Sequence, residues 1–134
     1  MTKNIFIFSL LASFVLFSCS GDDDSGTQAS IVGKWAYVDT VVNGVSYPYD
    51  DHEPCGKDYI EFKSDNTFIS VDIWDCEVDI DDQGNYTFEN NTLTINGEAV
   101  TVSELTQAKL SLTGTEDYDG DGSLDDIILN FERL

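Results

Sequence analysis

The chain has 134 residues, and its 26 Asp and Glu against 6 Lys and Arg give a formal net charge of −20. This length fits one domain, and six scattered cations argue against a nucleic-acid partner, because a phosphate backbone requires clustered Lys and Arg. Hydrophobic residues make up 41% of the chain and include 8 Phe, 6 Tyr and 2 Trp, which excludes a disordered acidic tail.

Residues 1–18 have the features of a bacterial signal peptide. Lys3 supplies a positive start, and the apolar run that follows it, residues 5–17, is shorter than the roughly 20 residues needed to span a bilayer. The run ends in a sequence that resembles the lipobox of bacterial lipoproteins, formed by Leu16, Ser18 and Cys19. The resemblance implies cleavage before Cys19, acylation of that cysteine and attachment to a lipid bilayer. An ordinary secreted protein with an incidental cysteine is the alternative.

Residues 19–30 are predicted to form the lipidated Cys19 and a flexible acidic tether. Positions 20–28 contain no apolar residue, and three acids occupy positions 22–24. This acidic run resembles the export signal of surface lipoproteins in some Gram-negative bacteria. The resemblance implies an outer-membrane lipoprotein exposed on the cell surface, whereas a solvated spacer is the alternative interpretation.

Short strands are predicted throughout residues 31–134. Apolar and polar residues alternate with period two, as expected for antiparallel strands with one buried face. The alternating runs lie at 59–63, 68–74, 77–81, 86–88, 93–95, 100–102, 110–112 and 127–132.

The segments between these runs favour hairpin turns. Asn43-Gly44 and Asn96-Gly97 suit type I′ turns, and further turns are predicted at 64–66, 82–85 and 90–91. Only residues 103–108 offer a short helical turn. The pattern predicts an all-β fold, an antiparallel up-and-down barrel of eight strands, with a two-sheet β-sandwich as the alternative.

Two cysteines remain in this domain if Cys19 is acylated. An even pair in an oxidising compartment predicts a disulfide between Cys55 and Cys76. A Cys/His metal site that includes His52 is the alternative, although His52 is the single histidine and no CxxC is present. His52 lies in a turn-rich acidic loop and is predicted to be solvated.

The motif Gly33-Lys34-Trp35 near the start of the domain, with Arg133 near its end, resembles the small lipocalin-like domains of bacterial lipoproteins. The resemblance covers residues 31–134. It implies a barrel closed at one end by Arg133 lying over the Trp35 ring, and an open end that binds a small apolar or amphipathic molecule. The candidate ligand-binding residues are the aromatics near predicted strand ends, Tyr37, Tyr47, Tyr49, Trp74 and Tyr86.

The segment 117–125 fits the pattern D-x-D-x-D-G-x-x-D and resembles calcium loops carried on β-hairpins. Carboxylates at alternate positions of a tight loop can converge on one Ca²⁺, which prefers six to eight oxygen ligands. The predicted ligands of this structural Ca²⁺ are Asp117, Asp119, Asp121, the carbonyl group of Ser123, and Asp125. An acidic, glycine-rich turn without an ion is the alternative.

No nucleophile motif, phosphate loop or histidine-based zinc motif is found in the sequence. The acids Asp72, Asp75, Glu77 and Asp79 are interpreted as the wet face of a strand whose other face carries Val78 and Ile80. We therefore expect a membrane-anchored binding protein and not an enzyme. The alternative is a filled barrel with no small-molecule ligand, whose acidic surface faces a surface protein or a glycan. An apolar cavity above about 300 Å³ favours the binding protein.

Overall fold

The computed structural model describes residues 29–134. The predicted signal peptide, the acylated Cys19 and the tether up to residue 28 lie outside the described residues. Within residues 29–134, no helix is long and apolar enough to cross a membrane.

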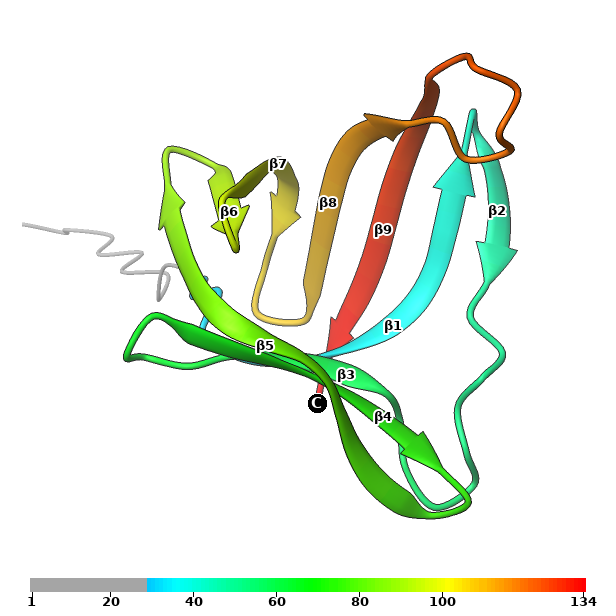
Figure 1. Cartoon of the computed structure of the whole chain (residues 1–134). Helices are drawn as coiled ribbons and strands as arrows, with labels where there is room; N and C mark the ends of the chain where they lie inside the picture. The colour runs from blue at the N-terminus through cyan, green and yellow to red at the C-terminus, as the bar shows by residue number, and fades with distance from the viewer. Residues whose placement is uncertain (1–28) are drawn as a thin grey trace, which may run out of the picture.

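Nine antiparallel strands form one sheet that closes on itself (Figure 1). They are β1 (Gly33–Val42), β2 (Val45–Pro48), β3 (Tyr59–Phe62), β4 (Thr67–Trp74), β5 (Glu77–Glu89), β6 (Thr92–Ile95), β7 (Glu98–Leu105), β8 (Lys109–Glu116) and β9 (Asp125–Arg133). Pairing of β1 with β9 closes a barrel of eight strands, to which β2 is an addition. The predicted eight-stranded barrel is confirmed, and this closure rules out the sandwich.

Strand β2 follows the predicted Asn43-Gly44 turn, but no alternation of apolar and polar residues marked it in the sequence. Strand β1 pairs with β3 through residues 33–36 and with β2 through residues 39–42, so one edge of β1 serves two partners in turn. The change of partner occurs at a bulge between Tyr37 and Asp39. All four residues of β2 are exposed, which explains why this strand lacks the alternation of buried and exposed residues seen in the others.

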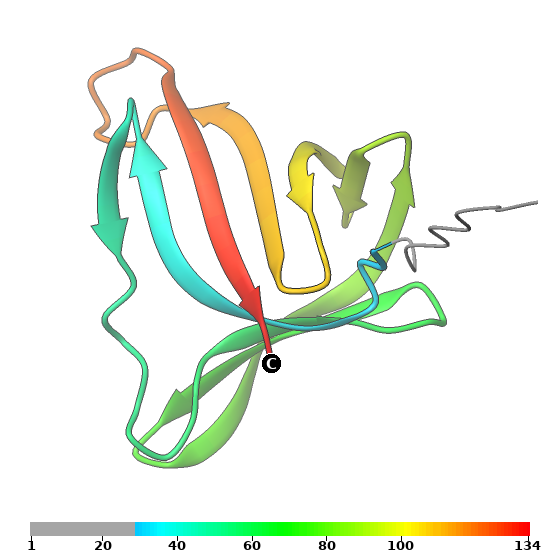
Figure 2. The ribbon, with the colours of Figure 1, turned by 180° about the vertical axis from the view of Figure 1, so that it is seen from behind.

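The turns between consecutive strands alternate between two ends of the barrel, which we call the closed end and the open end; Figures 1 and 2 show the strands from opposite sides. The closed end contains residues 29–32, the turns around 63–66, 90–91 and 106–108, and the end of β9. The open end contains the turns at 43–44, 75–76 and 96–97 and the loops 49–58 and 117–124. The largest core side chains lie towards the closed end and include Trp35, Phe62, Phe68, Tyr86, Leu93 and Leu110.

The two Asn-Gly hairpins form as predicted. Asn43, Gly44, Asn96 and Gly97 all have positive φ, the conformation that a type I′ turn requires at both central positions. The turn at 90–91 uses two asparagines with positive φ in the same way.

Two local predictions are wrong. Residues 82–85 do not turn, because they lie inside the continuous strand β5, which bulges opposite the Ser70–Val71 step of β4. Gly84 is needed there for close packing, since a Cβ atom would lie 1.9 Å from the Asn96 Oδ1 atom. Residues 103–108 form no helical turn either. The first three extend β7, and the Thr106 side chain then accepts hydrogen bonds from the next residues to make a tight turn.

The predicted disulfide joins Cys55 and Cys76, with the two Cα atoms 5.7 Å apart. It links loop 49–58 to the tip of the β4–β5 hairpin. The bridge therefore ties together two segments of the open end.

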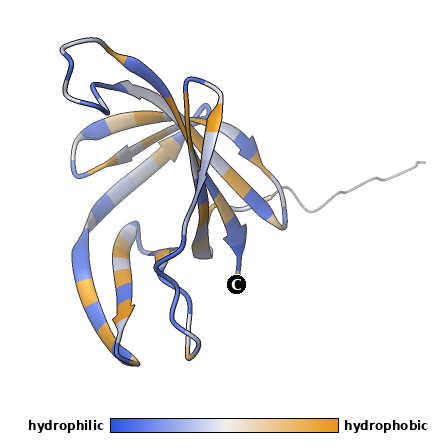
Figure 3. Ribbon diagram, turned by 90° about the vertical axis from the view of Figure 1, so that its right-hand side faces the viewer, coloured by the Kyte–Doolittle hydropathy of each residue, from blue (hydrophilic) through white to orange (hydrophobic). Residues whose placement is uncertain are grey.

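Apolar and polar residues alternate along most strands, as the colouring in Figure 3 shows. The β4–β5 hairpin departs from the expected burial. Val78 and Ile80 are 68% and 51% exposed. Asp72 pairs with Asp79, and both lie on the same face of the sheet as the core residue Phe68. Asp72 and Asp79 therefore lie on the interior face, and Val78 and Ile80 lie on the outer face. Val78 and Ile80 are exposed because this part of the hairpin extends past the core. Asp75, Glu77 and Asp79 are exposed as predicted, but Val78 and Ile80 on the other face are exposed as well, so the expected division into one wet and one buried face is wrong here.

Candidate binding cleft at the open end

A cleft opens in the barrel wall where β7 separates from β8. The two strands pair only from Thr101 and Thr113 towards the closed end. Beyond that point residues 98–100 pair with β6 alone and residues 114–116 pair with β9 alone, so two strand edges face each other without hydrogen bonds between them (Figure 1). A cleft of about 660 Å³ lies between them. It is lined by Ile95, Glu98, Ala99, Val100, Thr101, Leu112, Thr113, Gly114, Thr115, Glu116, Ile127 and Leu129.

The floor of the cleft is apolar and its rim is acidic. The strand pairing places five aliphatic side chains on the interior face, where they join the core or pack against it: Ile95, Val100, Leu112, Ile127 and Leu129. Glu98 pairs with Ile95, and Glu116 follows Gly114 by two positions, so both carboxylates lie on the interior face at the mouth. Gly114 leaves open space, because a Cβ atom there would meet no described atom within 4 Å.

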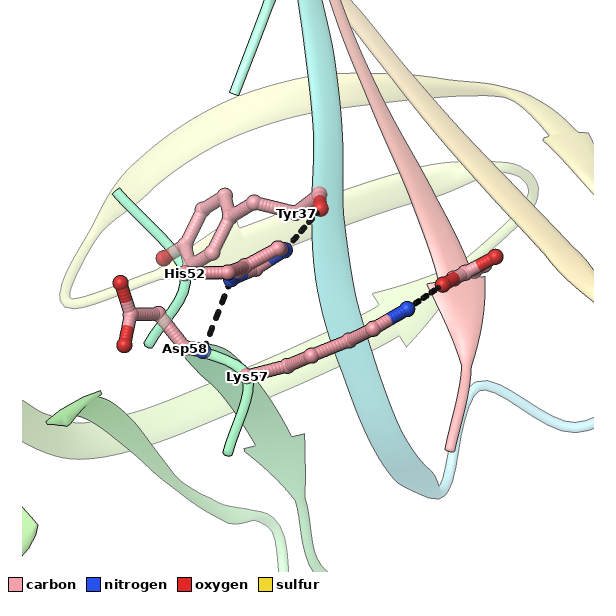
Figure 4. A network of polar contacts seen from close by, with 5 residues as sticks. Tyr37, His52, Lys57 and Asp58 are labelled. Atoms are coloured by element: carbon pink, nitrogen blue, oxygen red, sulfur yellow. Dashed lines mark hydrogen bonds and ion pairs between the residues drawn. The ribbon is translucent and has the colours of Figure 1, made fainter. Parts of the chain in front are cut away.

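The opposite side of the open end is held by loop 49–58 (Figure 4). His52 Nε2 lies 2.8 Å from the Tyr37 carbonyl oxygen, and His52 Nδ1 accepts the Asp58 N–H at 3.1 Å. Because a carbonyl oxygen only accepts, Nε2 carries the proton and the ring is neutral. His52 is half-buried, so its prediction as a solvated residue is wrong. It supports the chain where β1 changes partner, as does the Tyr49 N–H bond to the Val38 carbonyl.

Asp58 connects the same loop to β4. Its side chain is almost fully buried and accepts hydrogen bonds from the Tyr49 hydroxyl at 2.6 Å and from the Ile73 N–H at 2.8 Å. Burial and the bond to the Asp58 carboxylate raise the pKa of Tyr49 above its ordinary range. The Tyr49 hydroxyl therefore stays protonated and keeps donating at physiological pH.

The five aromatic residues predicted to bind ligand do not gather in the cleft. Tyr86 is buried in the core and donates its hydroxyl to the Lys63 carbonyl. Tyr37 of β1 and Tyr49 of loop 49–58 stack on each other, with ring centroids 5.1 Å apart. Tyr47 and Trp74 are exposed on β2 and at the β4–β5 tip. None of the five belongs to the cleft lining.

Arg133 and Trp35 meet at the closed end. The guanidinium carbon lies 4.1 Å from the centroid of the fully buried Trp35 ring, and the indole N–H donates to the Ile31 carbonyl at 2.7 Å. Arg133 also packs close to the Gly33 backbone, where a Cβ atom would lie 2.4 Å from Nη1. This explains why a glycine precedes the tryptophan by two positions.

The loop between β8 and β9 brings three of its predicted calcium ligands together. Asp117, Asp119 and Asp121 are exposed, and one carboxylate oxygen from each lies within 4.8 Å of the others. The carboxylate of Asp125 is placed differently, because it accepts hydrogen bonds from the Tyr118 N–H at 3.1 Å and from the Asn43 side chain at 2.6 Å. It thereby fixes the loop to the β1–β2 turn.

A family model described as a lipocalin-like domain matches residues 31–116. The chain belongs to the lipocalin-like domain family. Searches of curated proteins and of solved structures found no match. Lipocalin-like barrels suggest small-molecule binding, so the cleft at the open end is the candidate ligand site.

The lipocalin-like barrel carries a second hollow, on its outer surface. This groove of about 400 Å³ runs over β1, β8 and β9 and includes Asp39, Ser111 and Asn130. These three side chains bond one another, with Ser111 donating to Asn130 at 2.6 Å and Asn130 donating to Asp39 at 2.7 Å. The polar groups of these three side chains are therefore already partnered within the protein.

Sequence reasoning missed the cleft. The one signal available was Gly114, a small residue at an inward position of an otherwise alternating strand, followed by Glu116. The point beyond Thr101 and Thr113 where β7 and β8 stop pairing has no Pro to mark it.

Proposed function

We propose that this lipocalin-like protein is a membrane-anchored binding protein that takes a small apolar or amphipathic molecule into the cleft between β7 and β8. The observation that supports it is the aliphatic floor of a 660 Å³ cleft in the barrel wall. This volume lies within the range of small-molecule sites, about 300–1,000 Å³. We propose no enzymatic activity, because the polar side chains that line the cleft in the described chain are hydroxyls and carboxylates of β7 and β8, without a histidine beside them.

Titration with the neutral fluorescent probe N-phenyl-1-naphthylamine tests this function. We expect a saturable, blue-shifted rise in emission with the mature protein. Gly114→Phe should abolish it, because the ring would enter the open space above the cleft floor. Thr87→Phe, which adds the same ring on the exposed face of β5, is the matched control and should bind normally. Failure of the native protein to bind, or equal binding by Gly114→Phe, would refute the proposal.

We propose further that acylation of Cys19 anchors the protein in the outer membrane with the barrel on the cell surface. The described chain starts at the closed end, where Arg133 binds the Ser30 carbonyl oxygen at 2.5 Å. The anchor would therefore join the barrel at the end opposite the mouth of the cleft. Palmitate labelling of cells that express the protein should depend on Cys19, and Cys19→Ala should release the protein from membranes. Labelling that persists in Cys19→Ala, or resistance of the barrel to protease on intact cells, would contradict this part.

The β8–β9 loop is proposed to bind a structural Ca²⁺. The support is the proximity of the carboxylates of Asp117, Asp119 and Asp121, together with the positive φ of Gly120 and Gly122, which lets the loop turn sharply. Millimolar Ca²⁺ should raise the melting temperature relative to chelator. Asp119→Asn should reduce the rise, whereas the control Glu89→Gln, at the closed end, should preserve it. An unchanged melting temperature would contradict the proposal.

A further inference from the structure

Charge is distributed unevenly along the barrel axis. The open-end half comprises residues 39–58, 71–82, 95–101 and 114–126, and it carries 18 of the 23 acids between residues 29 and 134. The same segments contain one cation, Lys57, which forms an ion pair with Glu132. The closed-end half has five acids and four cations, so its charge is nearly balanced. The net negative charge of the described domain therefore lies around the opening that leads to the cleft.

Carboxylates also lie on the interior face of this end, beside the apolar floor. Glu98 and Glu116 border the cleft, and the described lining contains no lysine or arginine. Neither glutamate is part of an ion pair among the described residues. A ligand on the aliphatic floor would therefore meet two carboxylates without counter-ions at the mouth.

The opposite wall of the open end is negative as well. Asp72 and Asp79 pair across β4 and β5 on the interior face, where opposed like charges repel. Partial desolvation and then the neighbouring acids Asp58, Asp81 and Asp79 raise the pKa of Asp72. Burial, with a contribution from Asp81, Asp58 and Asp82, likewise raises the pKa of Tyr37, which points into the barrel. The negative field thus reaches the interior from more than one side.

We infer that the cleft selects organic cations with an apolar portion, such as alkylammonium compounds, over neutral and anionic amphiphiles. The inference rests on the proposed function and adds a substrate class to it. The apolar portion would cover the aliphatic floor, while the ammonium group would lie between Glu98 and Glu116 at the rim. A fatty-acid carboxylate entering the same way would meet repulsion from both glutamates and from the surrounding acids.

Competition against N-phenyl-1-naphthylamine tests the inference with three decyl compounds of different charge: decyltrimethylammonium, decanol and decyl sulfate. The measurement uses monomeric ligand in chelator, so that no Ca²⁺ alters the charge near the mouth. We expect the cation to bind most tightly and the anion most weakly, with the difference shrinking as salt rises. Binding of the probe without a preference for the cation would overturn this inference and leave the proposed function intact. Absence of probe binding would refute both.

Variants locate the source of the preference. Glu98→Gln combined with Glu116→Gln should lower the affinity for decyltrimethylammonium about 2- to 30-fold relative to decanol, because each exposed pair of a glutamate carboxylate and the ligand's ammonium group contributes modestly. The matched double variant Glu61→Gln with Glu89→Gln removes the same charge from the closed-end half and should leave the preference unchanged. Equal effects of the two double variants would contradict recognition at the rim.

Discussion

Arg133→Ala should destabilise the barrel more than removal of other cations of the closed end. The guanidinium lies over Trp35 at 4.1 Å and donates to three carbonyl oxygens: Nε to Gln107 at 2.8 Å, Nη1 to Val32 at 3.0 Å and Nη2 to Ser30 at 2.5 Å. One side chain thus joins the start of the described chain, the β7–β8 turn and the last strand. Alanine removes all four interactions at once.

The magnitude follows from these contacts. The cation–π contact contributes about 1 kcal/mol at a partly exposed site. Each hydrogen bond from a charged donor contributes about 1.5–3 kcal/mol when buried. The hydrogen bonds of Arg133 are solvent-accessible, so we discount each to about 0.5–1 kcal/mol, as for surface interactions. The expected loss in the free energy of unfolding is therefore about 2.5–4 kcal/mol.

Urea unfolding followed by tryptophan fluorescence and by circular dichroism measures this loss. Arg133→Lys keeps the charge but cannot reach three carbonyl groups in a planar fork, so it should recover less than half of the stability. Lys109→Ala, at the start of β8, is the control and should cost under about 0.5 kcal/mol. A loss for Arg133→Ala that matches the control, or full recovery by lysine, would refute the reasoning.

Three further predictions concern the open end. Removing the disulfide with Cys55→Ser and Cys76→Ser should lower the free energy of unfolding by about 3 kcal/mol, since the bridge closes a separation of 21 residues; an unchanged urea midpoint would contradict this. His52→Leu should cost about 1–3 kcal/mol in the same assay, because the Tyr37 carbonyl and the Asp58 N–H lose their partner, and wild-type stability would contradict a stabilising role for these two hydrogen bonds. Asp72→Asn should raise the urea midpoint at pH 7, because the raised pKa of Asp72 means that its ionised form is disfavoured in the folded state. That gain should vanish as the pH falls below the ordinary aspartate range, where the wild-type carboxyl is protonated; a gain that persists at pH 2 would show that charge is not its cause.

The sequence revealed features that depend on local pattern. Period-two alternation predicted the antiparallel strands, and Asn43-Gly44 and Asn96-Gly97 located two hairpins because few residues accept positive φ in succession. Cysteine number and compartment predicted the Cys55–Cys76 bridge. These signals depend on neighbouring residues or simple counts, so a single sequence contains them.

Features that depend on distant pairing were missed. Strand β2 is exposed on all its residues and carries no alternation, and it exists because β1 continues past the end of β3. The burial of Val78 and Ile80 was predicted wrongly because alternation identifies two faces without saying which one meets a core. The cleft arises from the register of β7 against β8, which neither strand encodes alone. His52 was misjudged for the same reason, since its partner Tyr37 is 15 residues away.

Methyl-labelled NMR of the mature protein, titrated with N-phenyl-1-naphthylamine, tests most directly the claim that the cleft between β7 and β8 is the ligand site. If the cleft binds the probe, the methyl signals of its floor should shift together and saturate at one affinity. The signals expected to move are those of Ile95, Val100, Leu112, Ile127 and Leu129. Shifts confined to the exposed residues Val78 and Ile80, or spread evenly over the barrel, would contradict the proposed site.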